Sequence, residues 1–291
     1  MVSIPEIENP VDRYLAYIEE RDAIYQRKSR GDPWPWTEDD ILRSYRFTEI
    51  YRERDRTSLH YQKLVRDRYG DDPIVLPATV LYRWFNRIET CEALFVPSVN
   101  QSVFEHYIET NMFSVLEDLI HSLPPPHVTG AFIITGKPGY SKAQGVLEYF
   151  KEWMKKPWQK KWRVWQALIP TLAEMDAWLD SDGLGSFLRA QLVADLKYVP
   201  FLRNAEDWWT WAAPGPGSMR GLNIVLGRDM NTSWNKKEWL TEIQKLRMLE
   251  DEHFSFQSFH AQDTQNHCCE FSKYTKVMIG EGRPRQVYHH A

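Results

Sequence analysis

The sequence has little cysteine and no long apolar run. Only three cysteines occur in 291 residues, and two of them, Cys268 and Cys269, are adjacent. That pattern offers neither a disulfide framework nor the ligand spacing of a metal site. No apolar stretch approaches the roughly 20 residues that span a bilayer, and the amino terminus lacks the basic start and apolar core of a signal peptide. We therefore expect a soluble intracellular protein with no membrane partner, no metal and no cofactor.

An excess of positive charge is also missing. The formal net charge is −4, so the protein as a whole is no polyanion binder, and any nucleic acid must be bound by a local basic patch. Apolar residues make up 43% and charged residues 26%, which is the balance of a globular protein. Aromatic residues are abundant, with 13 Trp, 14 Tyr and 13 Phe. They predict either a heavily aromatic core or flat surfaces for stacking rings.

The hydrophobic spacing predicts a mainly α fold in a single helical domain. Residues 1–36 would form an N-terminal helix and arm, and residues 37–291 the core. Residues 130–142 are the one stretch that favours an extended conformation, and the start of a helix is the alternative for it. Expected helices cover residues 10–28, 37–69 (one helix or two), 77–95, 103–123, 143–156, 157–179, 182–198, 214–228, 233–253 and 261–278.

The run YRERDR at 51–56 concentrates charge after an apolar stretch. On a helix Arg52 and Arg56 lie four residues apart on one face, with Asp55 on the same side. Two converging guanidinium groups suit a phosphate or a carboxylate, and Asp55 would fix their geometry. An intrahelical ladder of ion pairs explains the pattern equally well.

A second arginine stands among aromatic rings in YRWFNRIET, residues 82–90. Arg83 and Asn86 are three residues apart and face one way on a helix. A charge surrounded by rings needs a partner, so a phosphate or a stacked base is one interpretation. The other is an arginine whose stem is buried while its head reaches water.

The segment 151–165 is the local basic patch that the net charge requires. Its lysines would contact DNA phosphates, and its interleaved tryptophans would stack on bases or wedge between them. The alternative is an amphipathic helix with the tryptophans in the core and the lysines in water. The basic residues are Lys151, Lys155, Lys156, Lys160, Lys161 and Arg163, and the tryptophans are Trp153, Trp158, Trp162 and Trp165.

Two glycine turns each precede an expected helix, so their backbone N–H groups and the helix dipole favour an anion. The first turn, with Gly183, Gly185 and Ser186, resembles the hairpin with which helix-hairpin-helix proteins grip DNA backbone phosphate. The second turn contains Gly215, Gly217 and Ser218.

Behind the first turn, Gln191 and Asp195 share a face of a largely apolar helix. A buried carboxylate beside an amide is a candidate proton acceptor. Pairing of Asp195 with Lys197 or Arg203 is the simpler alternative.

The segment 263–276 aligns an amide, an acid and a base on one helix face. Asn266, Glu270 and Lys273 follow helical spacing, with Tyr274 one turn beyond Glu270. Facing a cleft, such a set would form the wall of an active site; on an exposed helix it is only an ion pair. His267 beside two cysteines does not indicate zinc, because adjacent residues cannot reach one ion without strain.

Five motifs in this order resemble those of the bacteriophage amino-acid:DNA transferases, first proposed as α-glutamyl/putrescinyl-thymine pyrophosphorylases. The resemblance spans roughly residues 40–285. Glu49 stands where the family would have Asn, and Cys91 where it would have Trp, and both bear on which amino acid is accepted. The motifs are RFTEIYRERDR (46–56), LYRWFNRIETCEAL (81–94), GLGSFLRAQLVADL (183–196), GPGSMRGLN (215–223) and QNHCCEFSKY (265–274).

The resemblance implies a fold similar to helical DNA glycosylases and an enzyme acting on duplex DNA that carries 5-phosphomethyl-deoxyuridine. The enzyme would replace the phosphate with the α-amine of a free amino acid, glycine being favoured, in the cytoplasm of an infected bacterium. Displacement would be direct or pass through an exocyclic methide. Tryptophans and Phe85 would fill the gap left by a flipped base.

In this interpretation Arg52 and Arg56 stabilise the leaving phosphate, and Asp195 or Glu270 takes the proton of the amine. The substrate is bound by Asp55, Arg83, Asn86, Gln191, Gln265, Asn266, Lys273, Tyr274 and the 215–218 turn. The 183–186 turn and the basic patch hold the DNA. Two alternatives stay open: a glycosylase that uses Asp195, and a non-catalytic DNA-binding subunit.

Overall fold

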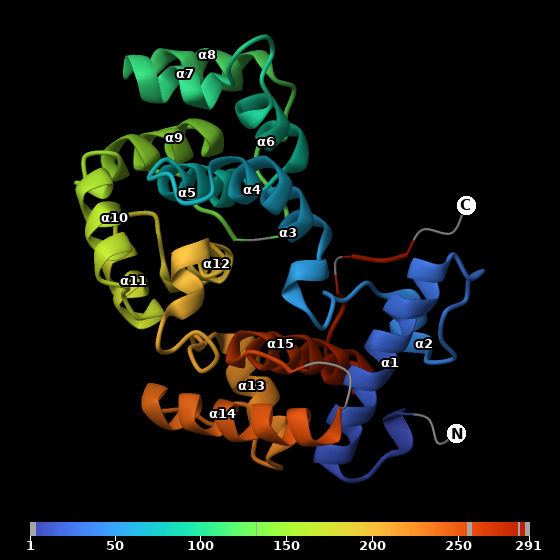
Figure 1. The fold of residues 1–291 in the computed structure, drawn as a ribbon. Helices are drawn as coiled ribbons and strands as arrows, with labels where there is room; N and C mark the ends of the chain where they lie inside the picture. The colour runs from blue at the N-terminus through green and yellow to red at the C-terminus, as the bar shows by residue number, and fades with distance from the viewer. Residues whose placement is uncertain (1–3, 132, 255–257, 285, 289–291) are drawn as a thin grey trace. The chain divides into compact units, whose positions relative to one another are not determined.

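The structure, a computed structural model, describes residues 4–131, 133–254, 258–284 and 286–288. The chain forms two compact units, one combining Met1–Asp55 with Trp209–Ala291 and the other consisting of Arg56–Trp208. Both are helical (Figure 1). Within the described residues there is no strand, only the isolated bridges Tyr45–Val287 and Ser181–Leu184. The mainly α class is confirmed, whereas the single domain and the likeness to glycosylases stay predictions.

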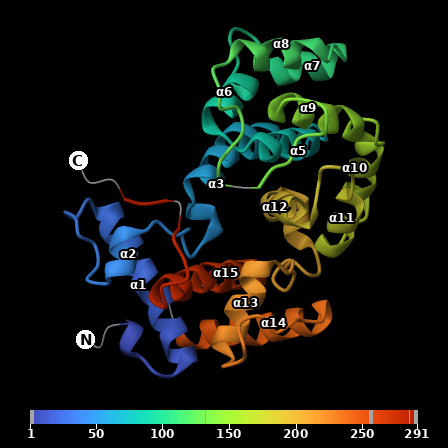
Figure 2. The same ribbon diagram turned by 180° about the vertical axis from the view of Figure 1, so that it is seen from behind.

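The first unit is built from both ends of the chain. Its short turns are η1 (Ile4–Glu6) and η2 (Arg52–Arg54), and its helices are α1 (Pro10–Arg30), α2 (Asp40–Ser44), α13 (Pro216–Val225), α14 (Lys236–His253) and α15 (Ala261–Met278). α15 is its central helix and crosses α13, as both ribbon views show (Figure 1, Figure 2). Rings hold α1 to α15: Tyr14 lies 5.3 Å from Phe271, and Tyr17 lies 5.1 Å from Tyr274, between centroids.

The second unit is built around one helix whose residues are all buried. Its elements are α3 (Arg56–Tyr61), the π-helical turn η3 (Gln62–Arg66), α4 (Asp67–Tyr69), α5 (Val75–Phe85), α6 (Ile88–Phe95), α7 (Val103–Thr110), α8 (Ser114–Ser122), α9 (Lys142–Trp153), α10 (Trp158–Ala167), α11 (Leu172–Leu179), α12 (Ser186–Leu196) and the 3-10 turn η4 (Pro200–Asn204). All 11 residues of α5 are buried. An apolar helix of this kind needs neighbours on every side, here including α9 and α12.

Three expected long helices are broken, and each break has a local cause. Asn86 (φ 45°) ends α5 and Asn111 (φ 55°) ends α7 in the left-handed region, which asparagine tolerates and most residues do not. The expected helix over 157–179 stops at Ala167 and resumes at Leu172, on either side of Pro170. By contrast, α1, α9, α12, α13, α14 and α15 confirm the helices expected from spacing.

Of the two alternatives for residues 37–69, the structure has the broken form, and the break lies between α2 and α3. Residues 45–51 are not helical, because the backbone binds elsewhere: Arg46 N–H donates to the Gln286 carbonyl (3.0 Å). Arg52 lies in η2, Asp55 is extended, and Arg56 begins α3. The two guanidinium groups therefore do not project from adjacent turns of one helix, which corrects the proposed fork.

Two other expectations also fail. The described part of 130–142 contains bends and turns but no strand, and residue 132 lies outside the described residues. The four tryptophans of 151–165 are between 0% and 7% exposed and Phe85 is fully buried, so they form core and cannot wedge between bases. Spacing alone could not separate a stacking ring from a core ring.

Candidate functional site

Segment 46–55 lies against α15 and binds its polar side chains. Thr48 N–H donates to Glu270 (3.3 Å), and Asn266 donates its amide N–H to the Thr48 hydroxyl (2.9 Å). One helical turn earlier, Arg52 N–H donates to Asp263 (3.3 Å). The predicted alignment of Asn266 and Glu270 is thus real, and part of its purpose is to satisfy the backbone of a segment that forms no helix.

A buried charged pair fixes the middle of this segment. His267, 2% exposed, contacts Glu250 (2.9 Å) through Nδ1 and the Ile50 carbonyl (2.7 Å) through Nε2. Tyr14 and Thr264 also donate to Glu250, which is 0% exposed. Burial lowers the pKa of His267, but the Glu250 carboxylate more than offsets this and raises it.

The raised pKa gives a prediction for His267→Gln. Stability from the imidazolium is complete below the ordinary pKa of about 6.5 and is lost as pH rises through the folded-state pKa. We expect urea-unfolding free energies of the unaltered chain to fall as pH rises above 6.5, and this slope to be smaller in the variant, where the contribution of His267 is lost and that of Asp55 remains. The variant should also lose about 3–5 kcal/mol at pH 6, because Glu250 keeps a buried charge without its partner.

His253→Gln is the matched control, since His253 lies exposed at the end of α14 in the same unit. Its slope should equal that of the unaltered chain. An equal slope in His267→Gln as well would show that His267 carries no linked proton.

Asp55, in the first unit, has a carboxyl group whose pKa is raised well above its ordinary value. Its carboxylate accepts the Glu49 N–H (2.9 Å) and is partly buried. Burial raises the pKa of Asp55 to about 7, and the neighbouring Glu49 and Glu270 charges act in the same direction against Arg52. A carboxyl group that titrates near neutral pH is suited to act as a general base.

The shift also predicts how Asp55 affects stability. Because its folded-state pKa is raised, the protonated group favours the fold and this contribution is lost as pH rises from about 4 to about 7. At about 1.4 kcal/mol per pKa unit the loss has an upper bound of about 4 kcal/mol. We expect Asp55→Asn, which can still accept the Glu49 N–H, to be more stable than the unaltered chain at pH 8 and equal at pH 4.

Urea unfolding at both pH values checks this, with Asp229→Asn, at an exposed turn of the same unit, as the control. A carboxyl ¹³C titration that put the Asp55 pKa near 4 would contradict the prediction.

Glu270 and Lys273 form an ion pair on the same helix. Glu270 is 5% exposed, whereas the Lys273 side chain is about half exposed. Burial lowers the pKa of Lys273, but Glu270 outweighs it and raises it. Tyr274 points elsewhere and donates to Asp39 (2.6 Å). Gln265 is partly buried, one turn before Cys269.

The 215–218 turn brings α13 into close contact with α15. A Cβ on Gly217 would lie 2.5 Å from Cys269 Sγ, and one on Gly221 would lie 1.8 Å from the Cys268 carbonyl oxygen. Ser218 is buried, and its hydroxyl exchanges hydrogen bonds with the Gly215 main chain (3.0 and 3.1 Å). Gly217 therefore has a packing role, and an anion at this turn stays a prediction.

By helical spacing, the α15 side chains Gln262, Asn266, Cys269 and Lys273 form one strip. Cys269 meets α13 on one side of it, and Asn266 and Glu270 meet segment 46–55 on the other. We call these four residues the α15 strip. With Asp55 and Glu270 beside it, the α15 strip is the candidate site in the first unit.

In the second unit, Arg83 and Asp195 pair with each other. Arg83 donates two hydrogen bonds to Asp195, one of 2.8 Å, and a third to Asn86 (2.8 Å). The arginine also lies 5.5 Å from the centroids of Tyr61 and Tyr82. Both charged side chains are 1% exposed. Sequence reasoning weighed Lys197 and Arg203 as partners and missed Arg83, because the pair joins helices 112 positions apart.

This pairing bears on the roles assigned to Asp195 and Arg83. A carboxylate neutralised by a two-pronged guanidinium is a poor proton acceptor, and an arginine so engaged is not open to a phosphate. Gln191 lies one turn earlier on α12 and is partly buried. Their catalytic and binding roles stay predictions.

The basic patch divides between water and structural contacts. Lys156 donates to the Trp178 and Asp180 carbonyls (2.8 and 2.7 Å) near the end of α11, Lys155 pairs with Glu152 (2.6 Å), and Lys151 pairs with Glu148 (3.9 Å). Lys161 lies over the Trp165 ring. Lys160 and Arg163 are exposed on α10. The buried tryptophans agree with the alternative of an amphipathic helix that faces the core. DNA contact by the exposed cations stays a prediction.

The 183–186 turn is a tight hairpin ahead of α12. Gly183 adopts φ 74°, and a Cβ there would lie 2.4 Å from the Tyr149 ring. Its carbonyl accepts the Trp84 indole N–H (3.1 Å). Gly185 and Ser186 border a pocket of about 220 Å³ with Phe187 and Ile133. A helix, hairpin and helix are thus present in α11, this turn and α12.

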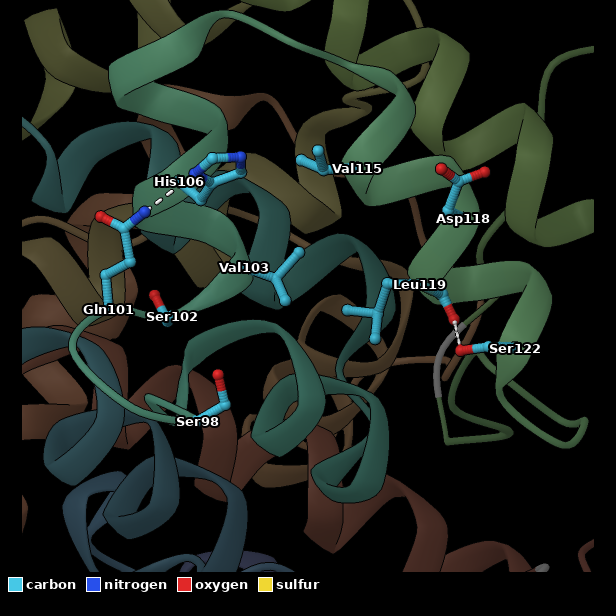
Figure 3. Close-up of a pocket in the computed structure, with 9 residues that line it drawn as sticks. All are labelled: Ser98, Gln101, Ser102, Val103, His106, Val115, Asp118, Leu119 and Ser122. Atoms are coloured by element: carbon cyan, nitrogen blue, oxygen red, sulfur yellow. Dashed lines mark hydrogen bonds between the residues drawn. The ribbon is translucent and has the colours of Figure 1, made fainter.

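A larger pocket, of about 560 Å³, lies at α7 and α8 and contains no residue singled out from the sequence (Figure 3). Gln101 contacts His106 (2.8 Å) on one side, and Asp118 and Ser122 lie on the other. Within the described residues no group of three or more His, Cys, Asp or Glu is arranged to hold a metal ion, and no helix is long and apolar enough to cross a membrane.

Comparison with known proteins identifies the family. The family described as 5-hmdU DNA kinase, helical domain, matches residues 8–283, so the chain belongs to it. A 5-hmdU DNA kinase of Bacillus phage SP10 is 38% identical over 88 residues, which cover 28% of this chain and 14% of that protein. The chain thus corresponds to a small part of that relative. No solved structure matches.

Proposed function

We propose that the chain modifies phage DNA by replacing the phosphate of 5-phosphomethyl-deoxyuridine with the α-amine of an amino acid. The family name supports the pyrimidine: the phosphate ester of 5-hydroxymethyl-deoxyuridine (5-hmdU) is 5-phosphomethyl-deoxyuridine, so a 5-hmdU kinase would make this substrate. The matched relative is a phage protein, which supports action on DNA in the infected cell. The five sequence motifs supply the finer assignment.

The geometry that carries the proposal is the place of Asp55, which accepts the Glu49 N–H (2.9 Å) in the segment whose Thr48 N–H donates to Glu270 of α15 (3.3 Å). Burial raises the pKa of this carboxyl group to about 7, and the charges of Arg52, Glu270 and Lys273 act on it. An amino acid enters with its amine protonated and must lose a proton before it can attack. We assign that proton to Asp55, because Glu270 is already paired with Lys273.

The bond changes follow from the substrates. The amine nitrogen bonds to the methylene carbon on C5, the carbon–oxygen bond to phosphate breaks, and phosphate leaves with the electron pair. Lys273 and Arg52 lie close enough to Asp55 for their charges to act on it, and they would favour the departing anion. The base is flipped out of the duplex to reach these groups, while the 183–186 turn, Lys160 and Arg163 bind backbone phosphates.

The decisive experiment incubates the protein with duplex DNA containing 5-phosphomethyl-deoxyuridine and a pool of amino acids. Digestion to nucleosides and mass spectrometry should reveal a heavier nucleoside that contains nitrogen from one amino acid. Asp55→Asn should slow its formation by roughly 10²–10⁴-fold at pH 7, and Asp229→Asn should leave it unchanged. Abasic sites in place of an adduct would indicate a glycosylase.

Phosphorylation of 5-hmdU is the second candidate, favoured by the names of the family and the relative. The same assay separates the two. DNA containing 5-hmdU, incubated with ATP and Mg²⁺, would gain a phosphate if the chain is itself a kinase, and amino acids would have no effect.

A further inference from the structure

Arg220 is a charged side chain beside the α15 strip that the proposed chemistry does not yet use. It lies on α13, three residues after Gly217, whose α-carbon packs against Cys269. Arg220 is partly buried, and among the described residues its Nε is a buried donor with no hydrogen-bond acceptor. A buried donor without an acceptor is costly and marks a place where a ligand can supply one.

The charges around Cys269 define what such a ligand must carry. Burial raises the pKa of the Cys269 thiol to about 11; Glu270 adds to this, while Lys273 and Arg220 oppose it. Glu270 and Lys273 neutralise each other as a pair, which leaves the Arg220 charge to be balanced. One negative group beside Arg220 would complete the set.

The start of α13 offers further donors about one helical turn before Arg220, the side toward which a helical side chain leans. Its N-cap is Gly215, which has no side chain to cap the first turn, and the helix has 10 residues. The N–H groups of that turn favour an anion. A planar carboxylate can accept from the Arg220 guanidinium and from this turn at once.

We propose that Arg220 and the first turn of α13 bind the α-carboxylate of the amino acid, with its amine directed to Glu270 and Asp55. The proposal rests on the amino-acid transfer proposed above. A zwitterion suits this arrangement, because its carboxylate can bind Arg220 while its ammonium group is directed to the two acids beside the α15 strip. The ligand class is therefore an α-amino acid rather than a simple amine.

Binding tests this without turnover. Each of the 20 amino acids is titrated against the protein by calorimetry, with and without duplex DNA containing 5-phosphomethyl-deoxyuridine, and the tightest is compared with its α-amide. The unaltered chain should prefer the acid to the amide. Arg220→Ala should weaken the binding of the amino acid at least about 10-fold and leave the binding of its α-amide unchanged. The preference for the acid would then be abolished. Arg220→Lys, which keeps the charge without the fork, should fall between them.

Arg228→Ala is the matched control, since Arg228 lies exposed just beyond α13 and stacks on Trp234. It should bind the amino acid as the unaltered chain does. Arg220→Ala should keep the unfolding midpoint of the free protein, because its Nε has no partner to lose. Equal binding by Arg220→Ala, or no binding of any amino acid to the unaltered chain, would overturn the proposal. If Arg220→Ala weakened the binding of inorganic phosphate but not that of the amino acid, Arg220 would be assigned to the leaving group instead.

The outcomes also separate this inference from the proposed function. If adducts form and Arg220→Ala leaves the KM for the amino acid unchanged, the transferase stands and the carboxylate site is wrong. If no adduct forms but binding of the amino acid depends on Arg220, the site stands and the transferase is wrong.

Discussion

Gly221→Ala is expected to prevent α13 from packing on α15 and to lower the unfolding free energy by more than about 3 kcal/mol. The added Cβ would lie 1.8 Å from the Cys268 carbonyl oxygen, which belongs to the main chain and cannot turn aside. The helices would have to separate, and the core residues Leu222 of α13 and Phe271 of α15 would lose packing contacts. Urea denaturation followed by circular dichroism measures the loss.

The same helix provides a graded control series. A Cβ on Gly215 would meet its nearest atom at 3.9 Å, and one on Gly217 would meet Cys269 Sγ at 2.5 Å. We therefore expect Gly215→Ala to cost least and Gly217→Ala an intermediate amount. Cys269→Ala should relieve Gly217→Ala, because it removes the atom that is struck, but not Gly221→Ala. A Gly221→Ala protein as stable as Gly215→Ala would mean that the two helices are not in this close contact.

Arg83→Met is expected to cost about 3–5 kcal/mol of unfolding free energy. The change removes the Arg83 charge from the buried Asp195 carboxylate, and Asn86 loses the donor to its side-chain oxygen. The double variant Arg83→Met with Asp195→Leu should recover much of this loss, because two apolar side chains need no partner in the core.

Arg189→Met is the control on the same helix as Asp195. Arg189 pairs with Asp176 and Asp180 at a partly exposed position, so its loss should cost about 1 kcal/mol or less. If Arg83→Met lowered the unfolding free energy no more than Arg189→Met does, the buried Arg83–Asp195 pair would not stabilise the packing of α5 on α12. Thermal and urea unfolding of the unaltered chain, Arg83→Met, the double variant and Arg189→Met measure these differences in unfolding free energy.

The candidate site was only partly predictable from the sequence. Helical spacing placed Asn266, Glu270 and Lys273 correctly relative to one another, because the distances within one helix are fixed by its pitch. It could not reveal that Glu270 also binds Thr48, 222 positions away. The fork of Arg52 and Arg56 failed for the same reason, since Gln286 and the α15 side chains Glu270 and His267 supply hydrogen bonds to the backbone of residues 46–50.

The sequence indicated that Arg83 needs a partner, but not that the partner is Asp195. It singled out the 215–218 turn, but not Arg220. Only packing showed that Arg220 has a buried donor without an acceptor and that Arg83 is neutralised inside a core.

The sequence by itself determined the helical class, six helices close to their true limits and the face that Asn266, Glu270 and Lys273 share. All of these depend on neighbours within a few residues. The tertiary structure decided which charges are paired, which tryptophans are buried and which carboxyl group titrates near neutral pH. Those properties depend on desolvation and on partners brought close by folding, and the same side chains would behave ordinarily in an unfolded chain.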